Sequence, residues 1–141
     1  SINKKMPLFA LSFIKENFKL SKKSKILMLG LSYKEDIGDL RHSPSVKLLK
    51  SLLELNKNIK ISDPFYKFNV LKCSNFKIKN NLKKFDLILL CLKHKQYKFL
   101  NVNLFSKKTV IMDLNNVLDK KQISNFKKNK FKLFTLGNNA A

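Results

Sequence analysis

The sequence predicts an α/β fold: a Rossmann-like three-layer sandwich with a mostly parallel sheet of about five strands, preceded by an N-terminal helix. The expected strands are continuous apolar runs without polar alternation, which is typical of strands buried on both faces of a parallel sheet. Stretches with helical periodicity separate most of these runs, as the crossover connections of a parallel sheet require. At 141 residues the chain is close to the usual size of one domain.

The first twenty residues predict an amphipathic helix that leads into a short polar linker. The apolar positions recur at helical spacing at Leu8, Leu11, Ile14 and Phe18. A polar run follows from Ser21 to Lys25. Such a helix either caps the domain that follows or belongs to a neighbouring one. Because the chain begins at Ser1 without a methionine, a fragment of a longer protein is one expectation and a standalone product is the other.

Strands and helices alternate from Lys25 onward. The expected strands are residues 26–29, 59–62, 86–92, 109–112 and 132–136. Helical patterns cover residues 45–55 and 119–128, and the lysine-rich segment that ends near Lys84 has room for another helix. Ser43 suits the N-cap position and Pro44 the first helical position, so we expect a helix to begin there.

The formal net charge of +21 raises the question of a polyanionic partner. Arg41 is the only arginine among 30 basic residues, whereas bidentate recognition of phosphate or guanine favours arginine. The lysines are also scattered along the whole sequence. We therefore expect a solvated lysine surface and no nucleic-acid partner, and a basic nucleic-acid-binding module is the least favoured function.

Other classes of protein are excluded by simple counts. The longest apolar run, Leu87 to Leu92, is far shorter than the roughly 18 residues of a membrane span, and no signal pattern opens the chain. We expect a cytoplasmic protein without a membrane partner. Cys73 and Cys91 have no CxxC spacing, which excludes zinc frameworks and disulfide scaffolds, so we expect reduced thiols and no metal site. Because Cys91 lies in the most apolar strand, burial should make it a poor nucleophile.

The loop after the first strand predicts an anion site. Ligands lie beyond the carboxyl ends of parallel strands. This loop brings Lys34 and Arg41 to the start of a helix, whose unpaired N–H groups favour a phosphate or pyrophosphate. Asp36 and Asp39 would orient the two cations or contact sugar hydroxyls. The alternative is an ion pair of Asp39 with Arg41 that fixes a long loop.

Three other observations concern residues that we expect at the same edge of the sheet. Gly30 is followed by Leu31 and not by a GxGxxG pattern, so we do not expect a self-sufficient NAD domain. Asp63 ends the second strand where such folds grip a ribose, although an Asx turn fits equally well. Candidate ligand contacts also follow the third strand, with a solvated loop as the default, at Lys93, His94 and Lys95.

These motifs resemble the C-terminal domain of the UDP-glucose and GDP-mannose dehydrogenase family of nucleotide-sugar 6-dehydrogenases. The resemblance rests first on GLSYKEDIGDLRHSPS, residues 30–45, and on DP at residues 63–64. It continues through the strand that ends at His94, through DLNNVLD at residues 113–119 and to LG at residues 136–137, so it covers nearly the whole chain. Asn3 to Pro7 resembles the end of that family's central helical region.

The resemblance implies an architecture and an activity. Members oxidise the C6 alcohol of a nucleotide sugar to a carboxylate, with NAD and a catalytic cysteine in a glycine-rich central motif, for polysaccharide precursor synthesis. Residues 1–20 would end the central dimerisation segment and residues 21–141 would form the nucleotide-sugar (UDP) binding domain. NAD would be held mainly by a domain absent from this chain. Partners would be a UDP-sugar, the NAD-binding and central domains, and a second subunit in the full-length homodimer.

The resemblance also assigns residues. Tyr33 and Lys34 would contact the nucleotide sugar, and Arg41 would reach toward NAD. Asn115 stands where many members have an arginine, which implies either a different sugar specificity or a lost substrate contact. Neither cysteine matches the catalytic motif, so we assign no catalytic residue and expect the chain alone to be inactive. A non-catalytic remnant or regulatory interaction domain is the alternative.

Overall fold

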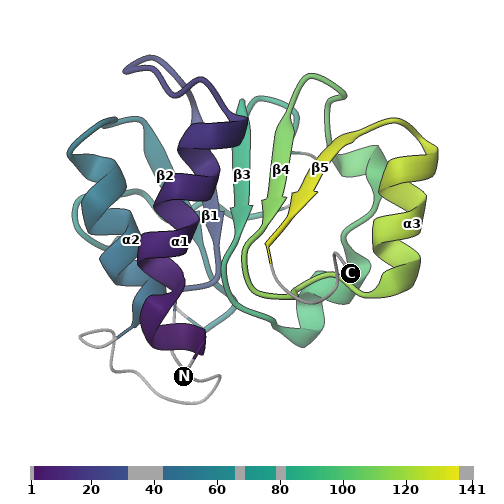
Figure 1. Ribbon diagram of the computed structural model, residues 1–141, viewed down its shortest axis with the longest axis horizontal. Helices are drawn as coiled ribbons and strands as arrows, with labels where there is room; N and C mark the ends of the chain where they lie inside the picture. Colours follow the sequence, from purple (N-terminus) through teal and green to yellow (C-terminus); the bar gives the residue numbers. More distant parts are fainter. Residues whose placement is uncertain (1, 32–42, 66–68, 79–81, 137–141) are drawn as a thin grey trace.

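A computed structural model of the chain describes residues 2–31, 43–65, 69–78 and 82–136, and places a five-stranded sheet between layers of helices (Figure 1). The strands are β1 (Ile26–Leu29), β2 (Ile59–Ser62), β3 (Leu87–Leu90), β4 (Val110–Asp113) and β5 (Lys132–Thr135). All neighbouring pairs are parallel, in the order β2-β1-β3-β4-β5. The predicted α/β, Rossmann-like class is confirmed, and the sheet is wholly parallel.

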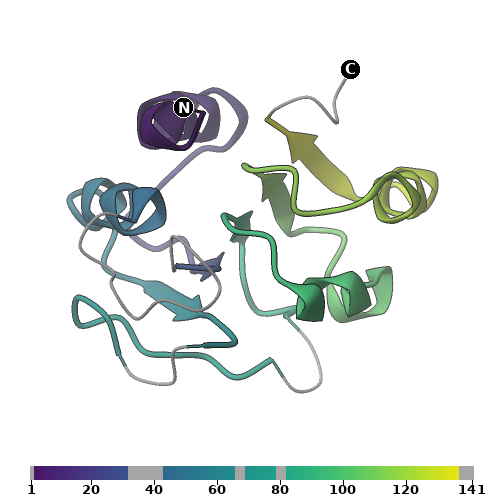
Figure 2. The same ribbon diagram turned by 90° about the horizontal axis from the view of Figure 1, so that it is seen from below.

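Each face of the sheet has its own apolar core, because successive side chains of a strand point to opposite faces. Ile26 and Met28 of β1 belong to the core beneath the first two helices, whereas Leu27 and Leu29 belong to the core on the other face. Helices α1 (Ile2–Asn17) and α2 (Pro44–Leu53) cover the first face, and α3 (Lys120–Lys128) lies beyond the second (Figure 2). The continuous apolar runs of the sequence therefore reflect burial on both sides.

Helix α1 caps this sheet. Ala10 and Ile14 are fully buried in the same core as β1 and α2. On the opposite side of the helix, Leu8 is 77% exposed and Phe9 is 59% exposed. Part of the apolar stripe thus packs on the sheet and part faces outward, while the domain division after residue 20 stays a prediction.

The helix starts that the sequence predicts are present. Ser43 is the N-cap of α2, and its Oγ accepts the Val46 N–H at 3.4 Å, with Pro44 at the first helical position. Asp119 caps α3 in a reciprocal capping box with Gln122. Both helices thus begin where polar side chains satisfy backbone N–H groups that would otherwise lack partners.

The connection from β2 to β3 differs from the expectation. The sequence left room for a helix before Lys84, but the described residues 69–78 and 82–86 contain none. Val70 and Cys73 instead form an isolated bridge. Two short 3₁₀ helices also follow β3, η1 (Lys95–Phe99) and η2 (Val102–Leu104), and neither was predicted. Such short segments have no 3.6-residue periodicity to detect. No helix in the described ranges is long and apolar enough to cross a membrane.

Candidate functional site

The strand order places the candidate site at the carboxyl ends of β1 and β3. From β1 the chain passes through α2 to β2 on one side, and it then crosses to β3 on the other side of β1. Ligands of open α/β sheets bind outside the carboxyl ends of the strands where the direction of strand addition reverses in this way, and this candidate position is called the β1/β3 crevice below. This edge includes Leu31 after β1, Asp63 after β2, the segment 91–94 after β3 and Asn115 after β4.

Gly30 brings the loop after β1 into direct contact with the segment after β3. Its φ is +92°, a conformation that other residues rarely adopt, and its N–H donates to the Ser62 carbonyl at 2.9 Å. A Cβ added here would lie 2.7 Å from Cβ of Leu92. The glycine is therefore required by close packing, and not by a dinucleotide fingerprint.

Leu31 is fixed by both of its backbone groups. Its N–H donates to Oδ2 of Asp63 at 2.7 Å, and its carbonyl accepts a hydrogen bond from the hydroxyl of Ser43. Leu31 and Ser43 are the described residues on either side of segment 32–42, and this hydrogen bond joins them. Tyr33, Lys34, Asp36, Asp39, Arg41 and His42 lie in that segment, outside the described residues.

Asp63 is a buried connector and not an exposed ribose ligand. It is 5% exposed, and its Oδ1 accepts the Phe65 N–H at 2.8 Å, which forms the expected Asx turn. Burial acts to raise the pKa of its carboxyl group, but hydrogen bonds from His94, Leu31 and Phe65 outweigh burial and hold the pKa below its ordinary value. The ionised carboxylate therefore joins the loops that follow β1, β2 and β3.

His94 completes this junction from the β3 side. Its Nε2 lies 3.3 Å from Oδ2 of Asp63, and the residue is 2% exposed, with its ring between Phe65 and Tyr97. Because a carboxylate only accepts hydrogen bonds, Nε2 carries the proton. The other ring nitrogen, Nδ1, is buried and has no hydrogen-bond partner in the described part of the chain. The default expectation of a solvated loop is thus wrong for His94, whereas Lys93 and Lys95 are exposed.

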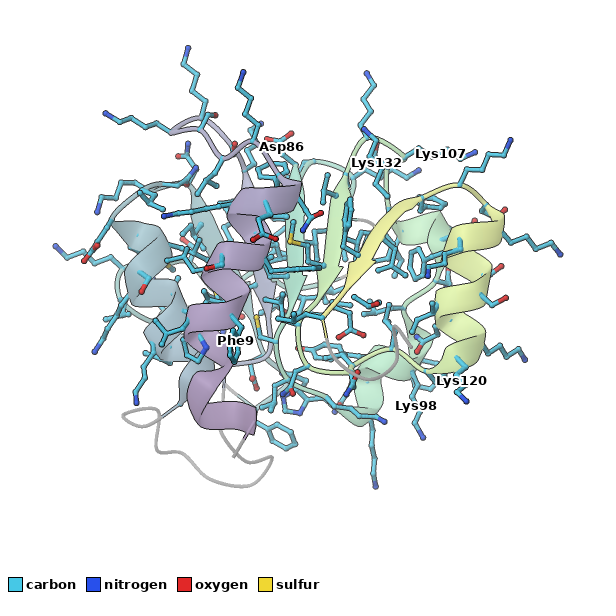
Figure 3. The ribbon with its side chains drawn as sticks, in the orientation of Figure 1. Phe9, Asp86, Lys98, Lys107, Lys120 and Lys132 are labelled. Atoms are coloured by element: carbon cyan, nitrogen blue, oxygen red, sulfur yellow. The ribbon has the colours of Figure 1, made fainter. Side chains whose placement is uncertain are left out.

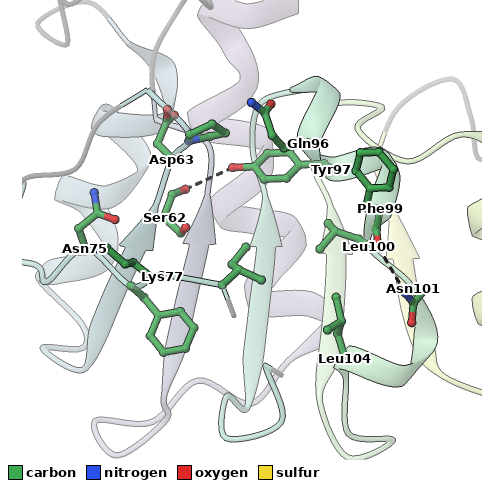
Figure 4. A pocket seen from close by; sticks show the side chains of 13 residues that line it. Ser62, Asp63, Asn75, Lys77, Gln96, Tyr97, Phe99, Leu100, Asn101 and Leu104 are labelled. Atoms are coloured by element: carbon green, nitrogen blue, oxygen red, sulfur yellow. Dashed lines mark hydrogen bonds between the residues drawn. The ribbon is translucent and has the colours of Figure 1, made fainter. Parts of the chain in front are cut away.

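A cavity of about 630 Å³ adjoins this junction on the face opposite to α1 and α2 (Figure 4). Ser62 and Asp63 form one end of it. Tyr97 forms a wall, and its hydroxyl donates to the Ser62 carbonyl at 3.3 Å. Burial, and then the nearby Asp63, raise the pKa of this hydroxyl well above its ordinary value. Tyr97 therefore remains protonated and acts as a fixed hydrogen-bond donor.

The predicted substrate residue Asn115 lies in the described part of the edge. It is half-buried, and its side-chain N–H₂ donates to the Cys91 carbonyl at 3.2 Å, which joins the loops after β4 and β3. Its Oδ1 makes no hydrogen bond to any described residue and is left as an acceptor at this edge. Asn115 therefore supplies a neutral polar group where an arginine would supply a charge.

Asp113 fixes the loop that carries Asn115. Its carboxylate accepts the N–H groups of Asn115, Val117 and Leu118 at 3.2, 2.8 and 2.8 Å. Burial nevertheless raises the pKa of this carboxyl group above its ordinary value, since loss of solvent outweighs the three backbone bonds. Asp113 is 1% exposed, so it shapes the loop and does not contact a ligand itself.

The cysteines have the structural role that was expected. Cys73 and Cys91 are both buried free thiols. Burial, and then the nearby Asp113, raise the pKa of the Cys91 thiol far above the neutral range, so it is not a nucleophile. Among the residues that the structure describes, no cluster of His, Cys, Asp and Glu could hold a metal ion.

Comparison with known proteins identifies relatives over nearly the whole chain. Residues 27–120 match the UDP binding domain of the UDP-glucose/GDP-mannose dehydrogenase family. The UDP-N-acetyl-D-mannosamine dehydrogenase of Methanocaldococcus jannaschii is 26% identical over 96% of this chain and 32% of its own length. The UDP-glucose 6-dehydrogenase of Rickettsia conorii is 31% identical over 79% of this chain and 28% of its own.

Solved structures agree on the fold. The UDP-D-ManNAc dehydrogenase of Pyrococcus horikoshii superimposes with a TM-score of 0.71 at 21% identity, over 97% of this chain and 32% of that one. The UDP-glucose dehydrogenase of Pyrobaculum islandicum gives a TM-score of 0.66 at 19% identity, over 94% of this chain and 29% of that one. The chain therefore spans about a third of the length of the proteins that it matches.

Proposed function

This chain belongs to the UDP-glucose/GDP-mannose dehydrogenase family, and we propose that it binds the nucleotide of a UDP-sugar whose C6 alcohol is oxidised to a carboxylate by an NAD-dependent enzyme. The observation that carries this proposal is the match to the UDP binding domain over residues 27–120, a range that includes the loops after β1, β2, β3 and β4. Relatives named for UDP-N-acetyl-D-mannosamine and for UDP-glucose support a UDP-sugar as the substrate class.

In this proposal the oxidation chemistry comes from outside the chain. NAD would accept a hydride when bound, but the described residues do not fit a dinucleotide cradle. The N–H of Leu31 already donates to Asp63, so it is not available to donate to a pyrophosphate. The buried Cys91 thiol is equally unable to form a covalent intermediate. We therefore expect the chain alone to bind substrate without turnover.

The proposed substrate contacts come from the segment between Leu31 and Ser43. Tyr33 and Lys34 would contact the nucleotide sugar, and Arg41 would reach toward NAD held by another domain. The positions of the flanking residues support this assignment, because Leu31 follows β1 and Ser43 is the N-cap of α2. The partial positive charge of a helix N-terminus favours a phosphate there.

Asn115 has a distinct proposed role across the crevice. Its Oδ1 can accept a hydrogen bond from a hydroxyl of the sugar that UDP carries, while its N–H₂ group remains bonded to the Cys91 carbonyl. The contact would select for a hydroxyl group and would add no attraction to the diphosphate. Discrimination between sugars, more than overall affinity for UDP, should therefore depend on this residue.

The assembly in this proposal is larger than the chain. Since the chain covers about a third of its relatives' length, NAD-binding and central domains are its proposed partners, with a homodimer in the full-length protein. The cytoplasm, where nucleotide sugars are made into polysaccharide precursors, is the proposed location.

Calorimetric titration of the chain with UDP tests the proposal. Lys34→Ala should weaken UDP binding about 10- to 100-fold, because one charge-assisted hydrogen bond contributes about 1.5–3 kcal/mol. Lys50→Ala, which removes an exposed lysine of α2, is the matched control and should bind as the unaltered chain does. Arg41→Ala should lower kcat/KM of an enzyme reconstituted with the NAD-binding domain more than it lowers UDP affinity. The proposal fails if UDP does not bind even when that domain is supplied.

A further inference from the structure

The fold collects lysines at the edge of the sheet opposite to the crevice, where the strands begin. Each of the five segments that lead into a strand carries at least one lysine. Figure 3 labels Lys107 at this edge, together with Lys132 at the start of β5. The lysines of these segments are Lys22, Lys23 and Lys25 before β1, Lys57 before β2, Lys83 and Lys84 before β3, Lys107 and Lys108 before β4, and Lys130 before β5. The acidic residues of these segments are Glu54 and Asp86.

Part of this edge is a hollow of about 400 Å³ with lysines on its walls. The lysines are Lys25, Lys57, Lys60, Lys72 and Lys84, and the remaining walls are Asn58, Ile59, Ser74 and Phe85. No carboxylate is among these described lining residues. The nearby Asp86 accepts the backbone N–H of Lys25 at 2.8 Å through Oδ2. The hollow therefore concentrates positive charge without an acidic group in its walls.

Two of these ammonium groups are held close together on one aromatic ring. The Nζ atoms of Lys60 and Lys84 lie 5.8 and 4.6 Å from the centroid of the Phe76 ring. Partial loss of solvent lowers the pKa of Lys84, and the neighbouring Lys60 and Lys25 lower it further. Like charges that are brought this close repel one another, and an anion between them would remove the repulsion.

Lys72 reaches the hollow through an unfavourable backbone turn. Leu71 and Lys72 have φ values of 49° and 66°, the left-handed region that residues with a Cβ seldom occupy. The flanking Val70 and Cys73 close the turn with two backbone hydrogen bonds of 3.1 and 2.8 Å. These two hydrogen bonds hold Lys72 in place although its backbone conformation is unfavourable. Lys72 is therefore the fifth lysine that lines the hollow.

We propose that this hollow binds a small polyphosphate anion at a site separate from the UDP-sugar crevice. Lysine is a hydrated point charge without the planar fork of arginine, so the site would select for charge more than for shape. A carboxylate or a single phosphate would neutralise only one or two of the five ammonium groups. A phosphate chain with several charges matches their number, and the volume lies within the usual range for small-ligand pockets.

Titration of the 141-residue chain with inorganic tripolyphosphate, at an ionic strength of about 0.15 M, tests this proposal. Lys60→Gln/Lys84→Gln should weaken binding at least about tenfold, because it removes both ammonium groups beside Phe76. Lys107→Gln/Lys108→Gln is the matched control, since it removes the same charge from the same edge outside the hollow. Unfolding midpoints at or above that of the unaltered chain show that both variants are folded.

Three outcomes would overturn the proposal. The first is that the unaltered chain fails to bind tripolyphosphate at this ionic strength. The second is that both double variants weaken binding equally, which would indicate general attraction to a basic surface. The third is tighter binding of polyuridylate RNA at equal phosphate concentration, which would indicate a nucleic-acid surface. A parallel titration with UDP separates this proposal from the proposed function, because the Lys60/Lys84 variant should leave UDP binding at the crevice unchanged.

Discussion

Leu31 is the residue on which the geometry of the crevice depends. Its N–H and carbonyl are held from two sides, by Asp63 after β2 and by Ser43 before α2, while His94 approaches Asp63 from β3. These contacts follow from the sheet order, because β1 lies between β2 and β3. A single buried carboxylate can therefore bond to groups that follow three different strands.

Replacement of Gly30 should be costly. Gly30→Ala places a Cβ 2.7 Å from Cβ of Leu92 and forces alanine into a φ of +92°. We expect a loss of about 2–4 kcal/mol in the free energy of unfolding, from the left-handed backbone and the overpacking together. Urea denaturation measures it, with Ser12→Ala on the exposed side of α1 as the control. A loss below about 0.5 kcal/mol would show that the close approach is not as described.

Asp63→Asn should lower stability by about 1–3 kcal/mol at pH 7, because an amide cannot accept hydrogen bonds from Leu31, Phe65 and His94 together. The effect should depend on pH. Since the folded-state pKa lies below the ordinary value of 3.8, the stabilisation is complete above pH 3.8 and is lost as the pH falls through the folded-state pKa.

Urea denaturation of both proteins at several pH values tests this dependence. The difference in the free energy of unfolding should be constant near neutral pH and should shrink only in strong acid. A difference that instead grows as the pH falls would contradict a lowered pKa for Asp63.

At the scale of elements, the two capped helices differ in what their caps reach. Ser43 caps α2 and also donates to the Leu31 carbonyl, so the start of this helix is tied to the crevice. Asp119 caps α3 through a capping box with Gln122, whose amide also donates to the carbonyls of Tyr97 and Leu100. Only the first cap bonds to Leu31, the described residue that precedes the segment with Tyr33 and Lys34.

Ser43→Ala and Asp119→Ala form a matched pair that separates stability from binding. Each should lower the free energy of unfolding by about 1–2 kcal/mol, since each removes an N-cap. Ser43→Ala should in addition weaken UDP binding, because Leu31 loses a tie to α2, whereas Asp119→Ala should not. Equal UDP affinities in the two variants, measured by calorimetry, would show that the Ser43 contact does not position the site.

Most of the regular elements could be predicted from local sequence. The apolar runs located all five strands, and the Ser43–Pro44 pair and Asp119 located two helix starts. The 3₁₀ helices after β3 and the irregular connection before it could not be predicted, because neither has a repeating pattern. The left-handed turn at Leu71 and Lys72 has none of the glycine or asparagine that normally signals such a turn.

For the molecule as a whole, the sequence predicted which residues follow the strands at the edge of the candidate site, but not the contacts between them. Asp63, His94 and Asn115 could each be placed after a strand, yet the Asp63–His94 pair required the strand order, which no local pattern encodes. The sequence also suggested evenly scattered lysines, because distance along a chain does not show that strand-entering connections meet at one edge. The two edges thus have different proposed roles, with UDP-sugar at one and polyphosphate at the other.

Amide chemical-shift mapping of the isotope-labelled chain with UDP tests the central claim most directly. If the crevice at the carboxyl ends of β1 and β3 binds the nucleotide, the largest shifts should fall on Leu31 and Ser43, and Lys34→Ala should reduce them at the same UDP concentration. Shifts confined to the opposite edge, at Lys25, Lys60 and Lys84, or no shifts at millimolar UDP, would contradict the assignment.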